Sequence, residues 1–147
     1  MRRNLLLTSF FALTVVSSSA FAANARGGIH FPLSEKIPMQ VAINGRLMTV
    51  EGRIWSATGG LGGGEHIHFD AKITNASQTT AFYSIHIAFF DYQWNLIAVD
   101  GFTQIFGQSP GKTDRHAADL YMPKSDLGNV AAYQITFYDN TVNIGKQ

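Results

Sequence analysis

Apolar and polar side chains alternate with a period of two residues along most of this chain. Residues 67–73 carry Ile, Phe, Ala and Ile at every second position, and residues 83–89 and 133–137 repeat the pattern. Successive side chains of a β-strand point to opposite faces, whereas an amphipathic helix requires a period of 3.6 residues. The alternation therefore predicts strands that bury one face, with a core that includes Phe69, Ile85, Ile87, Phe89 and Phe137.

Turn-forming residues divide this pattern into about seven segments. The Asn44-Gly45 dipeptide favours the positive φ angles of a type I′ turn, so we expect a hairpin there. The Ser109-Pro110-Gly111 stretch predicts a tight turn, because proline fixes φ and glycine tolerates a left-handed backbone. Residues 123–128 are expected to form a corner with one helical turn. Short strands at this spacing are typical of an all-β, antiparallel sandwich of about seven strands.

The first 22 residues have the pattern of a bacterial export signal. Two arginines precede an apolar run at 5–16, and Ala20-Phe21-Ala22 supplies the small-x-small cleavage pattern. The run is shorter than the ~20 apolar residues that a membrane-spanning helix needs. We expect cleavage after Ala22, with Ala23 as the first residue of a periplasmic or secreted protein. An N-terminal extension at 23–37 and a sandwich domain at 38–147 would then remain.

Charge and cysteine content exclude several classes of function. The chain has 11 basic and 10 acidic residues, and the signal contains two of the basic ones. Nucleic acids and anionic membranes call for clustered positive charge, so we expect neither nucleic-acid binding nor membrane insertion. The chain has no cysteine, which excludes disulfides, thiolate metal sites and cysteine nucleophiles.

Part of the chain resembles a known family. The resemblance rests on Ile87-Ala88-Phe89-Phe90-Asp91 with Leu96-Ile97 after a polar turn, and on Ser109-Pro110-Gly111-Lys112-Thr113 before a short strand. Residues 69–120 resemble the FxLyD-type, immunoglobulin-like domains of exported bacterial proteins, with Ile87 at the first aromatic position and Phe90 at the tyrosine position. Residues 135–139 form a second copy of the Phe/Tyr-Asp pattern. The resemblance implies an accessory or interaction domain and not an enzyme.

Four aromatic residues are candidate ligand contacts. Phe90 and Tyr138 are expected to point outward, and on neighbouring strands they would form an exposed pair, although packing under a loop is the simpler explanation. Tyr92 and Trp94 lie in the turn expected after Asp91. A turn tryptophan either folds back over the end of the sandwich or contacts a ligand, and exposure of both residues would favour the second interpretation. Trp55, at the end of an expected strand, is interpreted as core.

Two histidines separated by one residue form a candidate metal site. His66 and His68 share one face of a strand, and imidazole nitrogens bind Zn²⁺ and Cu²⁺. Asp70 lies on the same face and is the candidate third ligand, whereas His86 is expected to point outward from the opposite sheet. The same alternation also fits polar side chains on the solvent-facing side of a strand, with no metal. We expect no resident cofactor.

No sequence motif indicates catalysis. None of the serines lies in a nucleophile elbow, and residues 59–64 lack the Gly-Lys-Ser/Thr ending of a phosphate-binding loop. We therefore expect an exported, non-catalytic binding or accessory module that contacts an envelope or extracellular protein or a small ligand. The alternative function is a periplasmic transition-metal binding protein that uses the His66 and His68 pair.

Overall fold

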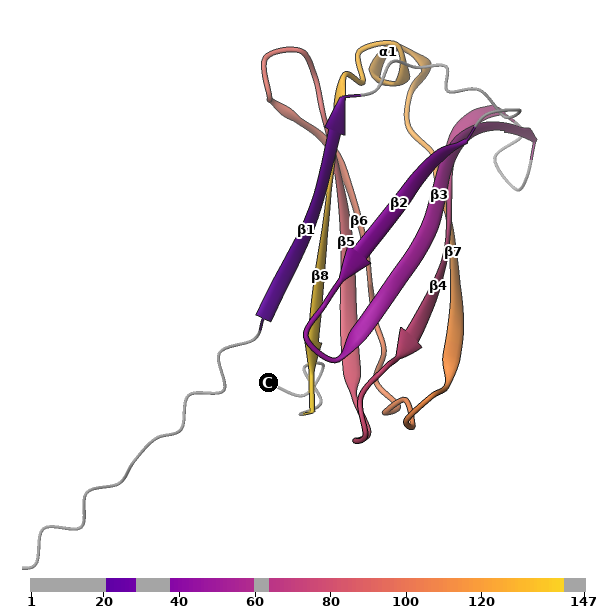
Figure 1. The fold of residues 1–147 in the computed structure, drawn as a ribbon. Coiled ribbons are helices and arrows are strands. Elements are labelled where there is room, and N and C mark those ends of the chain that lie inside the picture. Colours follow the sequence, from indigo (N-terminus) through magenta and orange to yellow (C-terminus); the bar gives the residue numbers. More distant parts are fainter. Residues whose placement is uncertain (1–20, 29–37, 60–63, 142–147) are drawn as a thin grey trace, which may run out of the picture.

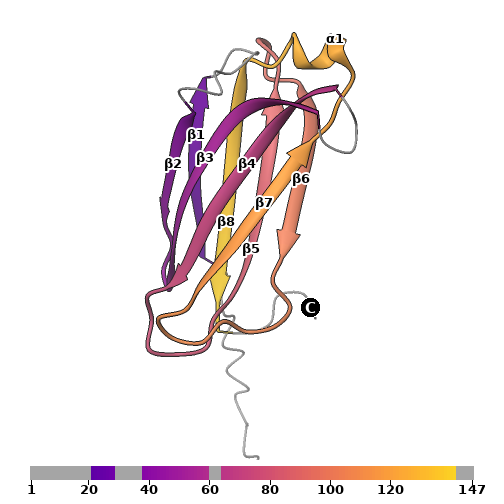
Figure 2. The same cartoon turned by 90° about the vertical axis from the view of Figure 1, so that its right-hand side faces the viewer.

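The chain forms a β-sandwich of two antiparallel sheets (Figure 1). The computed structural model describes residues 21–28, 38–59 and 64–141. The first sheet has the order β1-β8-β5-β6 and the second the order β2-β3-β4-β7. Strands of the second sheet run obliquely across those of the first (Figure 2). The strands of the first sheet are β1 (Phe21–Gly28), β8 (Ala132–Asn140), β5 (Phe82–Phe90) and β6 (Leu96–Thr103), and those of the second are β2 (Met39–Asn44), β3 (Met48–Gly59), β4 (Gly64–Asn75) and β7 (Thr113–Leu120).

The predicted all-β, antiparallel architecture is confirmed. The described residues form eight strands where about seven were expected, and the additional strand is β1. It pairs with β8 along its whole length, from Phe21 opposite Asp139 to Gly28 opposite Ala132. Most of β1 lies in the segment that we expected to be an N-terminal extension. Residues 1–20 lie outside the described residues, and with them most of the predicted export signal. In the described part, no helix is both long and apolar enough to cross a membrane.

The core lies between the two sheets and consists of the side chains that alternate inward. All five predicted core positions are at most 2% exposed, so the period-two interpretation is confirmed there. Neighbouring inward positions from both sheets, including Ile54, Ile67 and Ile135, are fully buried. The short helix α1 (Lys124–Leu127) confirms the helical turn expected at 123–128, and it adds the buried Leu127 to the core.

The predicted hairpin at Asn44-Gly45 exists, but its turn is not type I′. Asn44 pairs with Thr49, and the Gly45 amide donates to the Met48 carbonyl at 2.9 Å. Neither Asn44 nor Gly45 is among the residues with positive φ. Gly45 is needed for a different reason, since a Cβ there would collide with the Asp139 carboxylate. At the other predicted turn Gly111 has a φ of 71°, as expected.

The two aspartates at the ends of the Phe/Tyr-Asp segments have different roles. Asp91 caps the turn that follows it, because its carboxylate accepts from the Gln93 and Asn95 amides at 2.8 and 2.9 Å. Asp139 makes different contacts. Its carboxylate instead accepts from the amides of Leu47 (2.6 Å) and Met48 (2.9 Å), which belong to the opposite sheet's hairpin. Asp139 therefore connects the two sheets.

Candidate functional site

The outward face of β4 carries the predicted histidines, and this face is covered by neighbouring side chains. Because β4 lies between β3 and β7, its outward side chains are flanked on both sides. His66 is 3% exposed and Asp70 7% exposed. The expectation of a solvent-facing polar strand is therefore wrong at these positions. Long side chains of β3 and β7 exclude water from them, as Arg53 and Arg115 do at Asp70.

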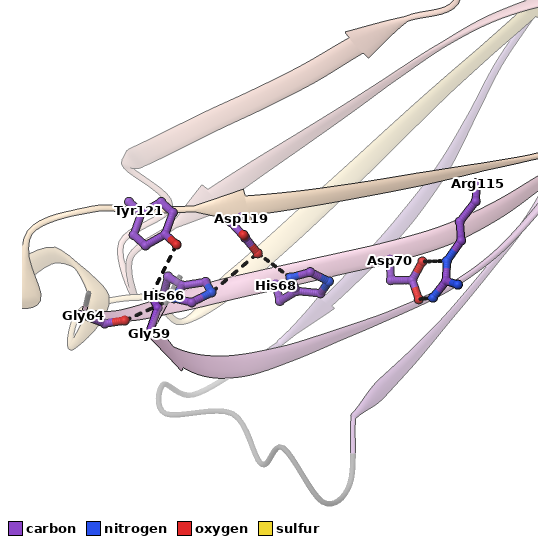
Figure 3. A network of polar contacts seen from close by, with 8 residues as sticks. All are labelled: Gly59, Gly64, His66, His68, Asp70, Arg115, Asp119 and Tyr121. Carbon is purple, nitrogen blue, oxygen red and sulfur yellow. Dashed lines mark hydrogen bonds and ion pairs between the residues drawn. The ribbon is translucent and has the colours of Figure 1, made fainter. Parts of the chain in front are cut away.

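Asp70 was the predicted third metal ligand, but in the structure its carboxylate pairs with two arginines. The Arg115 guanidinium donates to both carboxylate oxygens of Asp70 at 2.9 and 2.6 Å, and Arg53 donates to one at 3.2 Å. The hydrogen bonds from Arg115, opposed by burial and supported by Arg53, lower the pKa of Asp70 to about 2. These three residues line a shallow depression of about 620 Å³ on the outer face of the second sheet. The Asp70 carboxylate accepts hydrogen bonds from both arginines, and it points away from the histidines (Figure 3).

Asp119 takes the place that Asp70 was expected to fill. It lies on β7 directly opposite His68, and its carboxylate points toward both histidines (Figure 3). Oδ1 contacts His68 Nδ1 and lies 3.5 Å from His66 Nε2. The three potential ligand atoms lie within 4.8 Å of one another. We call His66, His68 and Asp119 the His–Asp cluster. It offers two imidazoles and a carboxylate, a donor set that suits a divalent transition metal.

Two aromatic side chains flank the cluster. The Trp55 ring lies 4.3 Å from the His68 ring, and the Tyr121 ring lies 4.5 Å from the His66 ring, measured between centroids. Trp55 was expected in the core, and this was wrong. Ile54 fills the inward position of β3, so Trp55 must point outward, where Arg53 lies over its ring. The aromatic rings restrict how the two imidazoles can rotate.

The remaining histidines lie away from the cluster or outside the described residues. His86 is exposed on the first sheet, where it contacts the Ser84 hydroxyl at 2.6 Å, so the expected separation from His66 is confirmed. His116 stacks on Phe102 with 4.6 Å between ring centroids, and burial lowers its pKa. His30 lies outside the described residues.

A second candidate region is the turn between β5 and β6, at the end of the sandwich that also carries α1 (Figure 1). Tyr92 is 67% exposed and Trp94 is 59% exposed, so the two turn aromatics are exposed together. Trp94 has a φ of 64°, a left-handed backbone conformation that is costly for a bulky residue. Its ring contacts Phe90, with 5.5 Å between ring centroids, and remains mostly exposed.

Phe90 and Tyr138 do not form the outward aromatic pair that we considered. Their strands are neighbours, but they run antiparallel, so Phe90 faces Ala132 while Tyr138 faces Ser84 near the other end of β5. Both side chains are half-buried, and the centroid of the Tyr138 ring lies 6.1 Å from that of the His86 ring. Of the four candidate aromatics, Tyr92 and Trp94 therefore remain exposed together, and Phe90 contacts the Trp94 ring.

Comparisons with known proteins assign no family. No protein-family model matches the chain, and no curated protein matches it. Among solved structures, the enzymatically active domain of tailspike protein 4 from bacteriophage CBA120 has a TM-score of 0.31 and 14% sequence identity. That match covers 83% of this chain and 17% of the tailspike chain. A likeness at this level assigns neither an ancestry nor an activity.

Proposed function

We propose that this chain is an exported, non-catalytic binding module that contacts a partner protein through its β5–β6 turn. The observation that carries the proposal is the joint exposure of Tyr92 and Trp94 on one short turn. Tyrosine and tryptophan are enriched in protein interfaces and among the residues that dominate binding energy. A turn at the tip of a sandwich is convex, which suits a protein surface better than a small molecule, because small-molecule sites are concave.

The rigidity of the turn supports the same proposal. Asp91 accepts hydrogen bonds from two backbone amides of the turn and from the Asn95 side chain. The amide of Trp94 donates to the Asp91 carbonyl at 3.1 Å. This network holds Trp94 in a left-handed conformation that costs on the order of 1–3 kcal/mol. A turn that holds an exposed tryptophan in one conformation loses little entropy on binding.

The finer fold and the export of the protein belong to the same proposal. Two packed antiparallel sheets are consistent with an immunoglobulin-like domain of the FxLyD type, to which residues 69–120 are similar. Cleavage after Ala22 would remove the first two residues of β1 and leave six paired with β8. The periplasm and the extracellular space are both compatible with this product.

Site-specific photocrosslinking tests the proposed contact. A photoreactive phenylalanine analogue is placed at position 94 in cells that export the protein, and at position 106 in a control. Phe106 is 76% exposed and follows β6, whose opposite end carries the β5–β6 turn. We expect a discrete crosslinked species from position 94 that position 106 does not give. The absence of any species specific to position 94 would overturn the proposal.

A pair of variants measures how much the aromatic side chains contribute. Without the photoreactive residue, Tyr92→Ala/Trp94→Ala should reduce co-purification of the partner that crosslinking identifies by at least about tenfold, because buried aromatic anchors dominate interface energies. Phe106→Ala removes a more exposed aromatic ring near the other end of the sandwich and should leave recovery of the partner unchanged. An equal loss in both variants would indicate nonspecific hydrophobic association.

A further inference from the structure

We propose that the His–Asp cluster is a binding site for an imidazole-preferring divalent metal ion, Zn²⁺ or Cu²⁺. The site is separate from the β5–β6 turn, since it lies on the outer face of the second sheet. Its ligands come from two hydrogen-bonded strands, with His66 and His68 on β4 and Asp119 on β7. Strand residues i and i+2 project from the same face, and the β4–β7 register places Asp119 beside them.

The distances between the ligand atoms are close to those that a metal requires. Zinc binds imidazole nitrogen and carboxylate oxygen at about 2.0–2.2 Å, which places tetrahedral ligand atoms about 3.4 Å apart. His66 Nε2 and Asp119 Oδ1 are 3.5 Å apart, and all three atoms lie within 4.8 Å of one another. Small side-chain movements would therefore bring the three atoms to coordinating distances without a change in the backbone.

The hydrogen bonding of His66 leaves one imidazole nitrogen available for a cation. His66 Nδ1 lies 3.1 Å from the carbonyl oxygen of Gly64, which can only accept, so Nδ1 carries the proton. His66 Nε2 then faces Asp119 Oδ1 at 3.5 Å and is the ring nitrogen available to a cation. A ligand histidine that donates its other N–H to a backbone carbonyl is the usual arrangement in metal sites.

Burial and access also suit a metal site. The side chain of His66 is 4% exposed, and that of Asp119 is 40% exposed, so an ion would enter from the Asp119 side. Trp55 and Tyr121 flank the two imidazoles and limit the entropy lost when the ligands become fixed. Three protein ligands leave a further position for water, which distinguishes this site from a closed structural zinc site.

The experiment is a calorimetric titration of untagged protein with Zn²⁺ and, separately, with Cu²⁺. We expect one ion per chain with micromolar or tighter affinity. Trp55 supplies a second measurement, since its ring is in contact with His68 and bound Cu²⁺ should quench its fluorescence. A Trp94→Phe background leaves Trp55 as the only tryptophan, because the chain has two.

Three matched variants identify the ligands. Asp119→Asn keeps the side-chain shape and should weaken metal binding by at least tenfold, a loss of the size that removal of one ligand causes. Asp70→Asn makes the same chemical change on the same face and should leave the affinity within about twofold, because Asp70 is held by Arg53 and Arg115. His86→Gln on the first sheet should also have no effect.

Folding of each variant is checked by near-ultraviolet circular dichroism. If Asp119→Asn does not fold, His68→Gln replaces it, since His68 is the more exposed of the two histidines. Unchanged affinity in the folded cluster variant would overturn the proposal, and so would an equal loss in His86→Gln. Loss of binding in Asp70→Asn alone would show that the sequence-predicted ligand is the correct one and would overturn the role of Asp119.

Discussion

At the scale of single residues, the two Phe/Tyr-Asp segments look alike in sequence and make different contributions to stability. Asp139→Ala removes the acceptor for two amides, of Leu47 and Met48, and leaves them without that partner. A buried unpaired donor costs about 1–3 kcal/mol, so the free energy of unfolding should fall by at least about 2 kcal/mol. Asp139→Asn retains one acceptor oxygen and should lose less. Chemical denaturation measures both, and Asp91→Ala, whose loss should be smaller because its turn is exposed, is the control.

His116 is the residue whose titration should be coupled to folding. Burial lowers its pKa below the ordinary value of 6.5, and the nearby Asp100 carboxylate only partly opposes this effect. The unfolded chain therefore binds more protons at this residue, and its contribution to stability is fully present above pH 6.5. That contribution is lost as the pH falls from 6.5 toward the lower, folded pKa. Denaturation of His116→Phe at several pH values should show a weaker decline in this window than the parent does, and an identical decline would contradict the assignment.

At the scale of elements, position 94 in the β5–β6 turn should favour glycine for stability and tryptophan for binding. Glycine adopts a φ of 64° without the steric cost that tryptophan has there. Trp94→Gly should therefore be at least as stable as the parent chain, while Trp94→Ala retains the backbone strain and gains nothing. Both variants should lose partner binding. Thermal unfolding separates them, and a clear destabilisation by glycine would show that the Trp94 ring contributes packing that outweighs the strain.

Strands could be predicted from the sequence, whereas the neighbours of each strand could not. Alternation places His66 and His68 on one face, because side-chain direction is a local property of a strand. It does not place β7 beside β4, so Asp119, 51 residues from His68, was missed as the third member of the cluster. Asp70 was predicted as a ligand for the same reason, because the sequence does not show which residues of β3 and β7 lie beside it. Its partner Arg115 lies 45 residues further along the chain, and no local pattern indicates that pairing.

At the scale of the whole molecule, β1 is the edge strand of the first sheet and covers one side of β8. Cleavage after Ala22 would leave residues 23–28 paired with β8, and intact-mass measurement of exported protein should give Ala23 as the first residue. A chain that begins at residue 29 leaves the backbone of β8 unpaired along one side. Open strand edges recruit other strands, so this shorter chain should have a lower free energy of unfolding and should self-associate.

Denaturation and size-exclusion chromatography of the two forms, starting at residues 23 and 29, test this expectation. β1 and β8 are the first and last strands of the described fold, and they pair with each other. Loss of this pairing should also loosen the contacts that Asp139 of β8 makes with the β2–β3 hairpin. Asp139→Ala should therefore cost less in the shorter chain than in the longer one, because the two changes act on the same strand. Equal costs in both chains, together with a monomeric shorter form, would show that β8 holds the hairpin without help from β1.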